Sequence, residues 1–382
     1  MDIVNKLDFT GQHIYVGMDV HKKSWNVSIH SANLEHKTYS QPPDPEVLVN
    51  YLRRNFPGAY YHCVYEAGFS GFWTYDRLTE QGIDCPVVNP ADVPTNDKER
   101  VTKSDRVDCR KLARSLRNGE LEGIYVPSSI KIEDRGLLRM RHNLIKKQTR
   151  CKNQIKSLLH FYGKSISEEV VLSHWSRRYI QELENIRMTR PAGAMALKTL
   201  LSELTHLREL IAQITREIIA LSRTEDYRES VHLLKTIPGI SILSAMTVLT
   251  ELVDISRFSS FDQLASYAGF IPNTHGSGER ERQTGITGRK NPVLRTLLIE
   301  SAWFAVRKDP AMMMAFNHRC VRMKKTRAII PMAKKLLSRI RFVLKNERPI
   351  KWQWYKREPF MEDRSYKSIA VGTVFVILQR VA

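Results

Sequence analysis

The chain has 382 residues, 42% of them hydrophobic, so it can build cores and is not a wholly disordered protein. Its 60 basic and 40 acidic residues give a formal net charge of +20. This excess favours a polyanionic partner, nucleic acid or an anionic membrane surface, over the substrates of a typical metabolic enzyme. The longest apolar run covers only residues 369–378, whereas a membrane span needs about 20 residues, so we expect no membrane partner.

The first residues lack the basic and apolar segments of a signal peptide. The five cysteines are scattered, and none has the CxxC or Cys/His spacing of a zinc site. We therefore expect reduced thiols in a cytoplasmic protein.

The N-terminal third alternates between strand and helix patterns. Strands are expected at 13–18, 25–29, 60–65 and 85–88, helices at 45–56 and 72–81, a helix from the N-cap Ser104 to Gly119, and a short segment at 124–126 that would close the sheet. A turn at 21–24 separates the first two strands. The pattern predicts an α/β domain with two early antiparallel strands.

Residues 131–225 contain few strand signals. Apolar residues recur at spacings of three and four in 137–159 and 195–221, which predicts a long helical hairpin or coiled coil. The longest apolar stripe comprises Leu197, Leu200, Leu201, Leu204, Leu207, Ile211, Ile214, Ile218 and Leu221. Packing within one chain and dimerisation explain this stripe equally well.

Residues 230–345 read as a second compact unit that is mainly helical. We therefore divide the chain into an α/β domain at 1–130, a helical hairpin at 131–228 and a mainly α domain at 229–358. The tail at 359–382 is apolar but short, and its pattern indicates no role.

Two short segments carry the whole basic excess. Residues 131–164 have a net charge of +8 and residues 316–358 of +12, while 1–130 and 165–315 are close to neutral. Such bands indicate separate contacts with nucleic-acid phosphates, although solvated helix faces are the alternative. Within the bands, the candidate contacts are Arg139, Arg141, Lys146, Lys147, Lys324 and Lys325.

Four carboxylates mark the α/β domain. Asp19 ends the first strand, Glu66 ends a later one, and Asp105 and Asp108 lie three residues apart on one face of the Ser104 helix. Each has a structural explanation if taken alone. As an ordered set they predict a site for Mg²⁺, with Mn²⁺ as the alternative, because hard oxygen ligands suit that ion and its phosphodiester chemistry.

A second motif, residues 233–241, contains Ile-Pro-Gly-Ile before an apolar helix at 242–252. It predicts a helix-hairpin-helix turn in which backbone N–H groups near Gly239 and the side chain of Lys235 face a phosphate. A plain turn in the core is the alternative.

A third motif is a glycine-rich basic loop. Gly276 and Gly278 flank Ser277 and would let the backbone bring this serine close to a ligand. The serine could be a nucleophile on phosphorus, although serine in such a loop is far more often a turn residue. Basic residues that could neutralise phosphate oxygens follow it: Arg280, Arg282, Arg289, Lys290 and Arg295.

The order of these motifs resembles the IS110 insertion-sequence family of transposases. The motifs are GMDVHK, YEAG, KSDRVDCRKLA, a basic helical hairpin, IPGIS and GFIPNTHGSGERERQTGITGRKNPVLR, and they cover about residues 13–345. The resemblance implies a RuvC/RNase H-like N-terminal fold with a DEDD metal site at Asp19, Glu66, Asp105 and Asp108. It also implies a serine nucleophile in a P-x-x-x-x-S-G pattern, which Pro272 and Ser277 match.

The chain departs from this family in one respect, because many relatives carry a second serine where Gly276 stands here. The resemblance further implies a structured bridge RNA that guides the protein to donor and target DNA. It implies dimers that form a tetramer on DNA, in a bacterial cytoplasm and associated with the nucleoid.

The expected function is thus an RNA-guided DNA transposase that uses the carboxylates and Ser277. Three alternatives stay open. A metal-only nuclease, such as a junction resolvase on the same fold, would not need the serine. A nucleic-acid-binding protein without catalysis could be built around the IPGIS turn. An actin-like phosphotransferase also begins with a strand–Asp–turn–strand pattern, although no further nucleotide loop follows and the charge opposes it.

Overall fold

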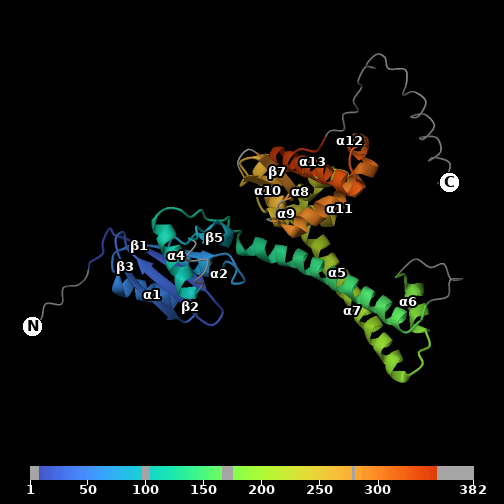
Figure 1. Cartoon of the computed structure of the whole chain (residues 1–382), viewed down its shortest axis with the longest axis horizontal. Coiled ribbons are helices and arrows are strands. Elements are labelled where there is room, and N and C mark those ends of the chain that lie inside the picture. Colours follow the sequence, from blue (N-terminus) through green and yellow to red (C-terminus); the bar gives the residue numbers. More distant parts are fainter. Residues whose placement is uncertain are drawn as a thin grey trace, which may run out of the picture. The chain divides into compact units, whose positions relative to one another are not determined.

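The structure is a computed structural model (Figure 1). It describes residues 8–96, 104–165, 175–277, 280–286, 288 and 290–350, and over 273–286 only the backbone of two strands. The described chain divides into two compact units, one up to Asp134 and one from Arg135 onwards. No helix in the described ranges is both long enough and apolar enough to cross a membrane.

The first unit is built on a mixed five-stranded sheet. Its strands are β1 (His13–Val20), β2 (Trp25–His30), β3 (Glu35–Gln41), β4 (Tyr60–Glu66) and β5 (Val87–Val88), in the order β3-β2-β1-β4-β5. The β1–β2 and β2–β3 pairs are antiparallel, whereas β1–β4 and β4–β5 are parallel. The predicted α/β class and the early antiparallel pair are confirmed.

Helices cover both faces of this sheet. The helices are α1 (Pro45–Asn55), α2 (Trp73–Glu80) and α4 (Asp105–Arg117), with a short 3₁₀ turn at Pro90–Asp92. Side chains such as Ile14, Met18 and Leu48 form a core between the sheet and α1 and α2. On the other face, Val64 and Val88 pack against Leu112 of α4. Because strand side chains alternate in direction, one sheet supports both layers.

Two predictions for this unit are wrong in detail. Strand β3 was not expected, because its sequence, EHKTYSQ, is polar, as suits an edge strand with one solvated face. Residues 124–126 do not form a strand. The amide of Ile124 nevertheless bonds to the sheet, donating to the carbonyl of Val87 at 2.7 Å.

Three helices lead into the second unit. They are α5 (Ser129–Phe161), whose first residues belong to the first unit, the short α6 (Arg177–Glu184) and α7 (Pro191–Leu221). Two contacts show that α5 and α7 run antiparallel: the Cys151 thiol donates to the Leu200 carbonyl at 3.3 Å, and Arg141 Nε donates to Thr215 Oγ1 at 2.8 Å. The helical hairpin is therefore present, while its coiled-coil character stays a prediction.

The apolar stripe of α7 is used inside the chain. Leu197, Leu201, Leu204 and Leu207 are buried against α5 and α6, and Ile218 is buried in the core of the C-terminal helices. Packing within one chain is thus sufficient to explain the stripe.

The remaining helices form one core around α11 and α13. They are α8 (Glu225–Lys235), α9 (Ile242–Leu252), α10 (Phe261–Ala268), α11 (Pro292–Lys308), α12 (Pro310–Cys320) and α13 (Lys325–Asn346). Between α10 and α11 stand β6 (Pro272–Ser277) and β7 (Arg280–Ile286), paired as an antiparallel hairpin. The domain boundaries at 130, 228 and 358 stay predictions, and the tail at 359–382 lies outside the described residues.

Candidate metal centre

The site lies where two parallel strands end side by side. The register of β1 and β4 pairs Met18 with Tyr65, so the next residues, Asp19 and Glu66, stand at the same edge of the sheet. Parallel neighbours bring their carboxyl ends together. The fold thus places two carboxylates from distant parts of the sequence on adjacent strands.

Helix α4 brings the other two carboxylates to this edge. Its N-cap is Ser104, whose Oγ accepts from the amide of Val107 at 3.4 Å, and Asp105 and Asp108 occupy the first turn, where the helix dipole favours negative charge. The predicted N-cap and the shared face are confirmed.

A glycine lets α4 lie directly on β1. A Cβ atom at Gly17 would stand 2.1 Å from the carbonyl oxygen of Cys109 and 2.3 Å from the amide nitrogen of Ala113. Neither backbone atom can move aside without shifting the helix. The absence of a side chain at Gly17, two residues before Asp19, therefore sets how closely the helical and strand carboxylates approach.

A histidine and a lysine divide the four carboxylates into two pairs. His21 Nε2 lies 3.1 Å from Asp19 Oδ2 and 3.7 Å from Asp105 Oδ2. Lys111 Nζ lies 3.4 Å from Asp108 Oδ1 and 3.8 Å from Glu66 Oε1. The site therefore combines carboxylates from two strands and one helix with two groups that can carry positive charge.

These groups match what a divalent cation requires. One ligand atom from each of Asp19, His21 and Asp105 lies within 4.8 Å of those of the other two. Burial raises the pKa of Asp19; the His21 charge opposes this, and the neighbouring charges of Asp105 and Asp108 raise the pKa further. A cation would relieve the repulsion, and the carboxylate oxygens are the ligands that suit Mg²⁺ or Mn²⁺.

The sequence indicated the four carboxylates but not their two partners. Lys111 lies three residues after Asp108, a spacing that puts both on one helix face, and its side chain is only 8% exposed. His21 was interpreted only as a turn residue. The helical spacing was a usable sequence signal for Lys111. For His21 the sequence offered no such signal, because its ring reaches Asp19 only through the fold of the turn.

Comparison with known proteins identifies the family. A model of the IS116/IS110/IS902 transposase family matches residues 231–317, and a model of DEDD transposases of the IS110 type matches residues 16–163. The putative transposase y4rJ of Sinorhizobium fredii is 30% identical over 299 residues, which are 72% of this chain and 74% of the relative. The chain belongs to the IS110 family of transposases.

Two further relatives are similar over shorter stretches. The putative transposase y4qE of Sinorhizobium fredii is 30% identical over 64% of this chain, and the transposase for insertion sequence element IS1111A of Coxiella burnetii is 28% identical over 62%. This chain spans 58% and 63% of the length of these two relatives.

The IS110-type motif around Ser277 is a hairpin rather than the expected loop. Ser277 ends β6 and pairs in register with Arg280 of β7, next to the pair of Gly276 and Glu281. Residues 278–279 and 289 and the side chains of 273–287 lie outside what the structure describes. Alternating polar residues concealed the strands, because their glycines and charges are depleted in strands generally.

The IPGIS motif is a tight turn between α8 and α9. Ile237 and Ile240 are buried, and Gly239 has a φ of +89°. A Cβ atom at Gly239 would stand 2.5 Å from the carbonyl oxygen of Ser301 in α11. The turn is thus packed against α11, while Lys235 at the end of α8 is exposed. Phosphate contact by this turn stays a prediction.

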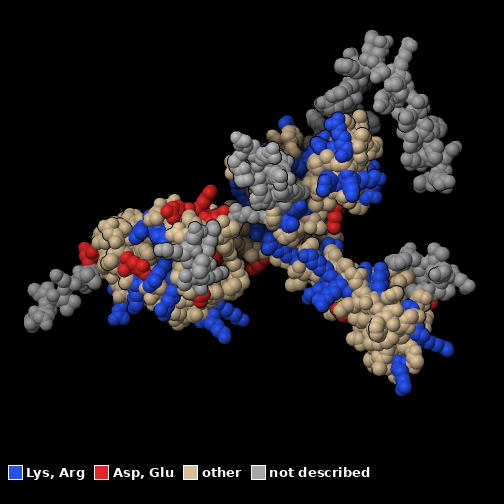
Figure 2. Space-filling view, in the orientation of Figure 1, with Lys and Arg blue, Asp and Glu red and all other residues tan. Residues whose placement is uncertain are grey.

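The candidate basic residues fall into two groups. Lys146, Lys147, Lys290, Lys324 and Lys325 are exposed. Figure 2 shows Lys and Arg side chains gathered along α5 and over the region of α12 and α13. By contrast, both Arg139 and Arg141 are bonded within the unit, Arg139 to Glu251 and Arg141 to Thr215. These two arginines therefore support the fold, although Arg139 is also half-exposed, and phosphate contact by either of them stays a prediction.

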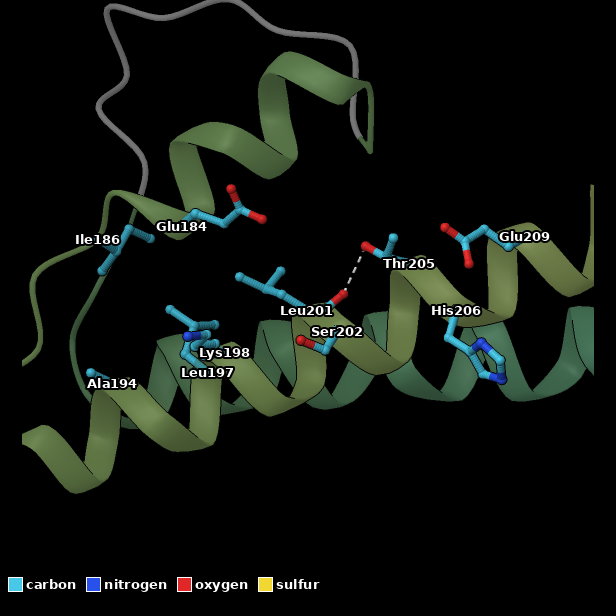
Figure 3. A pocket seen from close by; sticks show the side chains of 10 residues that line it. All are labelled: Glu184, Ile186, Ala194, Leu197, Lys198, Leu201, Ser202, Thr205, His206 and Glu209. Atoms are coloured by element: carbon cyan, nitrogen blue, oxygen red, sulfur yellow. Dashed lines mark hydrogen bonds between the residues drawn. The ribbon is translucent and has the colours of Figure 1, made fainter.

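A cavity of about 720 Å³ lies in the helical arm, away from every predicted site residue. Figure 3 shows Glu184 and Ile186, from α6 and the turn after it, facing Leu197 and Leu201 of α7. Its walls combine apolar side chains with the polar or charged side chains of Glu184, Lys198, Ser202, Thr205, His206 and Glu209. With one lysine among them, the cavity lacks the cluster of basic groups that a phosphate site would offer.

Proposed function

We propose that this chain is an insertion-sequence transposase that cuts and rejoins DNA. The observation that carries the proposal is the gathering of Asp19, Glu66, Asp105 and Asp108 at one edge of the sheet, together with membership of the IS110 family. The strand order β3-β2-β1-β4-β5, with β2 antiparallel to β1, supports assigning the first unit to the RuvC/RNase H-like fold.

The carboxylates would hold a divalent cation against the scissile phosphate. Asp19 and Asp105 would be the principal ligands, because among the described residues they face only the imidazole of His21. Glu66 and Asp108 would lie next to them, since the ammonium of Lys111 already neutralises part of their charge. When bound, Mg²⁺ or Mn²⁺ supplies Lewis-acid stabilisation of charge on the phosphate oxygens. The protein itself orients the ligands by seating α4 on Gly17.

Ser277 would supply the nucleophile. Its Oγ attacks phosphorus and loses its proton to a base, the bond from phosphorus to the 3′ oxygen breaks, and that oxygen leaves as a free 3′-hydroxyl. The DNA is then joined to the protein through a 5′-phosphoserine. Attack by the 3′-hydroxyl of a second DNA reverses these bonds and returns the serine. On β7, Arg280 pairs with Ser277 and Arg282 pairs with His275, and both arginines would stabilise the developing charge.

The remaining basic surface would bind nucleic acid. The exposed lysines of α5 and α13 suit donor and target DNA and a structured bridge RNA, whose base pairing would supply sequence specificity. Lys235, Gly239, Arg289 and Lys290 complete the proposed contacts. Dimers that assemble into a tetramer would bring a carboxylate site and a serine hairpin from different copies to one phosphate.

Two substitutions test the chemistry. We expect Asp19→Ala and Ser277→Ala each to abolish recombination of the DNA that flanks the gene while DNA binding is largely kept. Ser256→Ala, at an exposed serine between α9 and α10, is the matched control and should retain full activity. On a denaturing gel, DNA labelled at its 3′ ends should shift with wild-type protein, because the protein becomes joined to a 5′ phosphate.

The same gel separates the alternatives. Cleavage by Ser277→Ala, with no adduct in any lane, would favour a metal-only nuclease. Salt-sensitive binding without cleavage in Mg²⁺ would favour a non-catalytic binding protein. The guide is tested separately: nucleic acid that co-purifies with the protein, digested with RNase or DNase, should contain a discrete RNA that maps beside the gene. Heterogeneous RNA would remove the guide from the proposal.

A further inference from the structure

A fully buried carboxylate lies beneath the serine hairpin. Glu251, on α9, has an exposed fraction of 0%. Its Oε1 accepts from Arg139 Nε at 2.8 Å, and its Oε2 accepts from Arg139 Nη2 at 2.9 Å and from Asn291 Nδ2 at 2.7 Å. Three donors therefore satisfy this one buried charge, as a carboxylate inside a core requires.

The same network joins the two stems of the hairpin, which are the chain segments that lead into β6 and out of β7. Tyr267 stands before β6 and Asn291 after β7, and the amide of Asn291 donates to the carbonyl of Tyr267 at 2.8 Å. The Tyr267 hydroxyl donates to the backbone carbonyl of Glu251 at 3.0 Å and lies 3.2 Å from Asn291 Nδ2, which donates to it. The chain that leaves for the hairpin and the chain that returns are thus bonded to each other and to Glu251.

Two further details show how closely the stems are held. A Cβ atom at Gly269, which has a φ of +77°, would stand 2.4 Å from Cβ of Lys290 on the other stem. Asn291 is also the N-cap of α11, because its Oδ1 accepts from the amide of Leu294 at 3.0 Å. One side chain therefore joins the returning stem to the start of a core helix and to Glu251.

We propose that Glu251 is a positioning residue for Ser277: with Arg139, Asn291 and Tyr267 it clamps the base of the β6–β7 hairpin and so fixes where the serine stands. This inference rests on the proposed function of Ser277. The carboxylate itself is buried beneath the stems and contacts no substrate. Since these two stems connect the hairpin to the helical core, holding them together is a means by which the core can orient its end.

Hydrogen–deuterium exchange on the full-length protein tests the clamp without any substrate. Glu251→Gln keeps the shape but places an amide N–H₂ against the donors of Arg139 or Asn291. We expect the amides of β6 and β7 to exchange about ten times faster in this variant, while the centres of α5 and α13 stay protected. The control is Asp262→Asn, at an exposed carboxylate on α10, which should leave the hairpin unchanged.

The adduct assay tests whether the clamp positions the serine. With DNA labelled at its 3′ ends and taken from the flanks of the gene, Glu251→Gln should lose at least nine-tenths of the phosphoserine adduct but bind the DNA as wild type does. Arg139→Lys, which keeps one charged donor, should fall in between. Should Glu251→Gln fail to fold, Tyr267→Phe removes a single hydroxyl from the network and should give the same two changes at smaller size.

The outcomes separate the clamp from the chemistry. Hairpin exchange that is unchanged in both Glu251→Gln and Tyr267→Phe would overturn the clamp, whatever the protein does to DNA. Faster exchange with a wild-type yield of adduct would overturn the positioning role. If wild-type protein forms no adduct, the serine chemistry fails instead, and the exchange experiment still decides whether the stems are clamped.

Discussion

Asp19 and Glu251 are carboxylates at two different sites, and their surroundings act on them in opposite directions. Glu251 is completely buried; burial raises its pKa, but the hydrogen bonds of Arg139 and Asn291 and the charges of Arg139 and Arg135 lower it more, and the net pKa lies below its ordinary value. Asp19 is only partly buried, yet burial and two neighbouring carboxylates leave its pKa above the ordinary value.

This is the difference that we expect between a carboxylate with a structural role and one that binds a cation. The fold supplies Glu251 with every donor it needs, so nothing is gained by a further cation. It gives Asp19 one imidazole and surrounds it with like charge, an arrangement that costs stability until a cation binds. The pKa is therefore lowered at Glu251 in the proposed clamp and raised at Asp19 in the candidate metal centre.

The largest loss of stability should come from removing the carboxylate of Glu251, which accepts hydrogen bonds from Arg139 and Asn291. Glu251→Ala strands Arg139 and Asn291 beneath the hairpin, and we expect the free energy of unfolding to fall by about 3 kcal/mol. This is near the lower end for a broken buried pair, because half of Arg139 is exposed and can be rehydrated. Urea unfolding measures it, with Asp262→Asn as a control that should change by less than about 0.5 kcal/mol. If Glu251→Ala and Asp262→Asn lose the same free energy of unfolding, the buried network contributes no more to stability than an exposed carboxylate does.

The next effect concerns the contact that builds the metal centre. Gly17→Ala drives a Cβ atom into the backbone of α4 at Cys109 and Ala113, so we expect a loss of about 1–3 kcal/mol and weaker Mn²⁺ binding as α4 moves away. At Gly136, an exposed position within α5, an added Cβ atom would meet nothing within 4 Å, and Gly136→Ala should stabilise the protein by up to about 1 kcal/mol. A harmless Gly17→Ala would show that α4 has room to spare.

The sequence predicted the four carboxylates of the candidate metal centre, whose role stays a prediction, and little of the proposed clamp. Asp19, Glu66, Asp105 and Asp108 were predictable because strand ends and a helical spacing of three are local features. Lys111 lies at a helical spacing from Asp108 and could have been predicted, whereas His21 joins the site through a turn that a pattern of residue types does not contain. Their contacts with the carboxylates emerge only in three dimensions.

Glu251 shows the complementary limit. In the sequence it is one acid within the apolar run 242–252, with no local feature that separates it from a surface charge. Its partners Arg139 and Asn291 are 112 and 40 residues away, and Arg139 read as part of a phosphate-binding band. Strand β3 and the β6–β7 hairpin were missed for a related reason, since polar strands derive their identity from their neighbours in the sheet.

The pH dependence should run in opposite directions at the two sites. Because the folded pKa of Glu251 is below the unfolded 4.5, its contribution is present above pH 4.5 and lost as the pH falls through the folded value. Because the folded pKa of Asp19 is above the unfolded 3.8, stability is lost as the pH rises from 3.8 through the folded pKa. In the presence of a chelator, Asp19→Asn should therefore be more stable than wild type at pH 7.

Urea unfolding from pH 7 to below pH 4.5 measures this difference. The advantage of Asp19→Asn should shrink as the pH falls towards 3.8, whereas the deficit of Glu251→Gln should persist down to pH 4.5 and shrink only below it. Adding Mn²⁺ at pH 7 should reverse the order of wild type and Asp19→Asn, since only wild type keeps the ligand. An Asp19→Asn variant that is less stable than wild type in chelator would contradict the idea of a carboxylate held ready for a cation.

The smallest effect on stability should come from removing the ammonium of Lys111, which lies between two of the carboxylates. Lys111→Met keeps the length of the side chain but removes the ammonium between Glu66 and Asp108, and we expect a loss of about 1 kcal/mol in chelator. Mn²⁺ should stabilise this variant more than it stabilises wild type, because the ion and the ammonium neutralise the same oxygens. Lys147→Met, at an exposed position of α5, should respond to Mn²⁺ as wild type does. If Mn²⁺ stabilises Lys111→Met and wild type equally, the ammonium and the cation occupy separate parts of the cluster, and Glu66 and Asp108 would then belong with Glu251 among the carboxylates that the fold satisfies by itself.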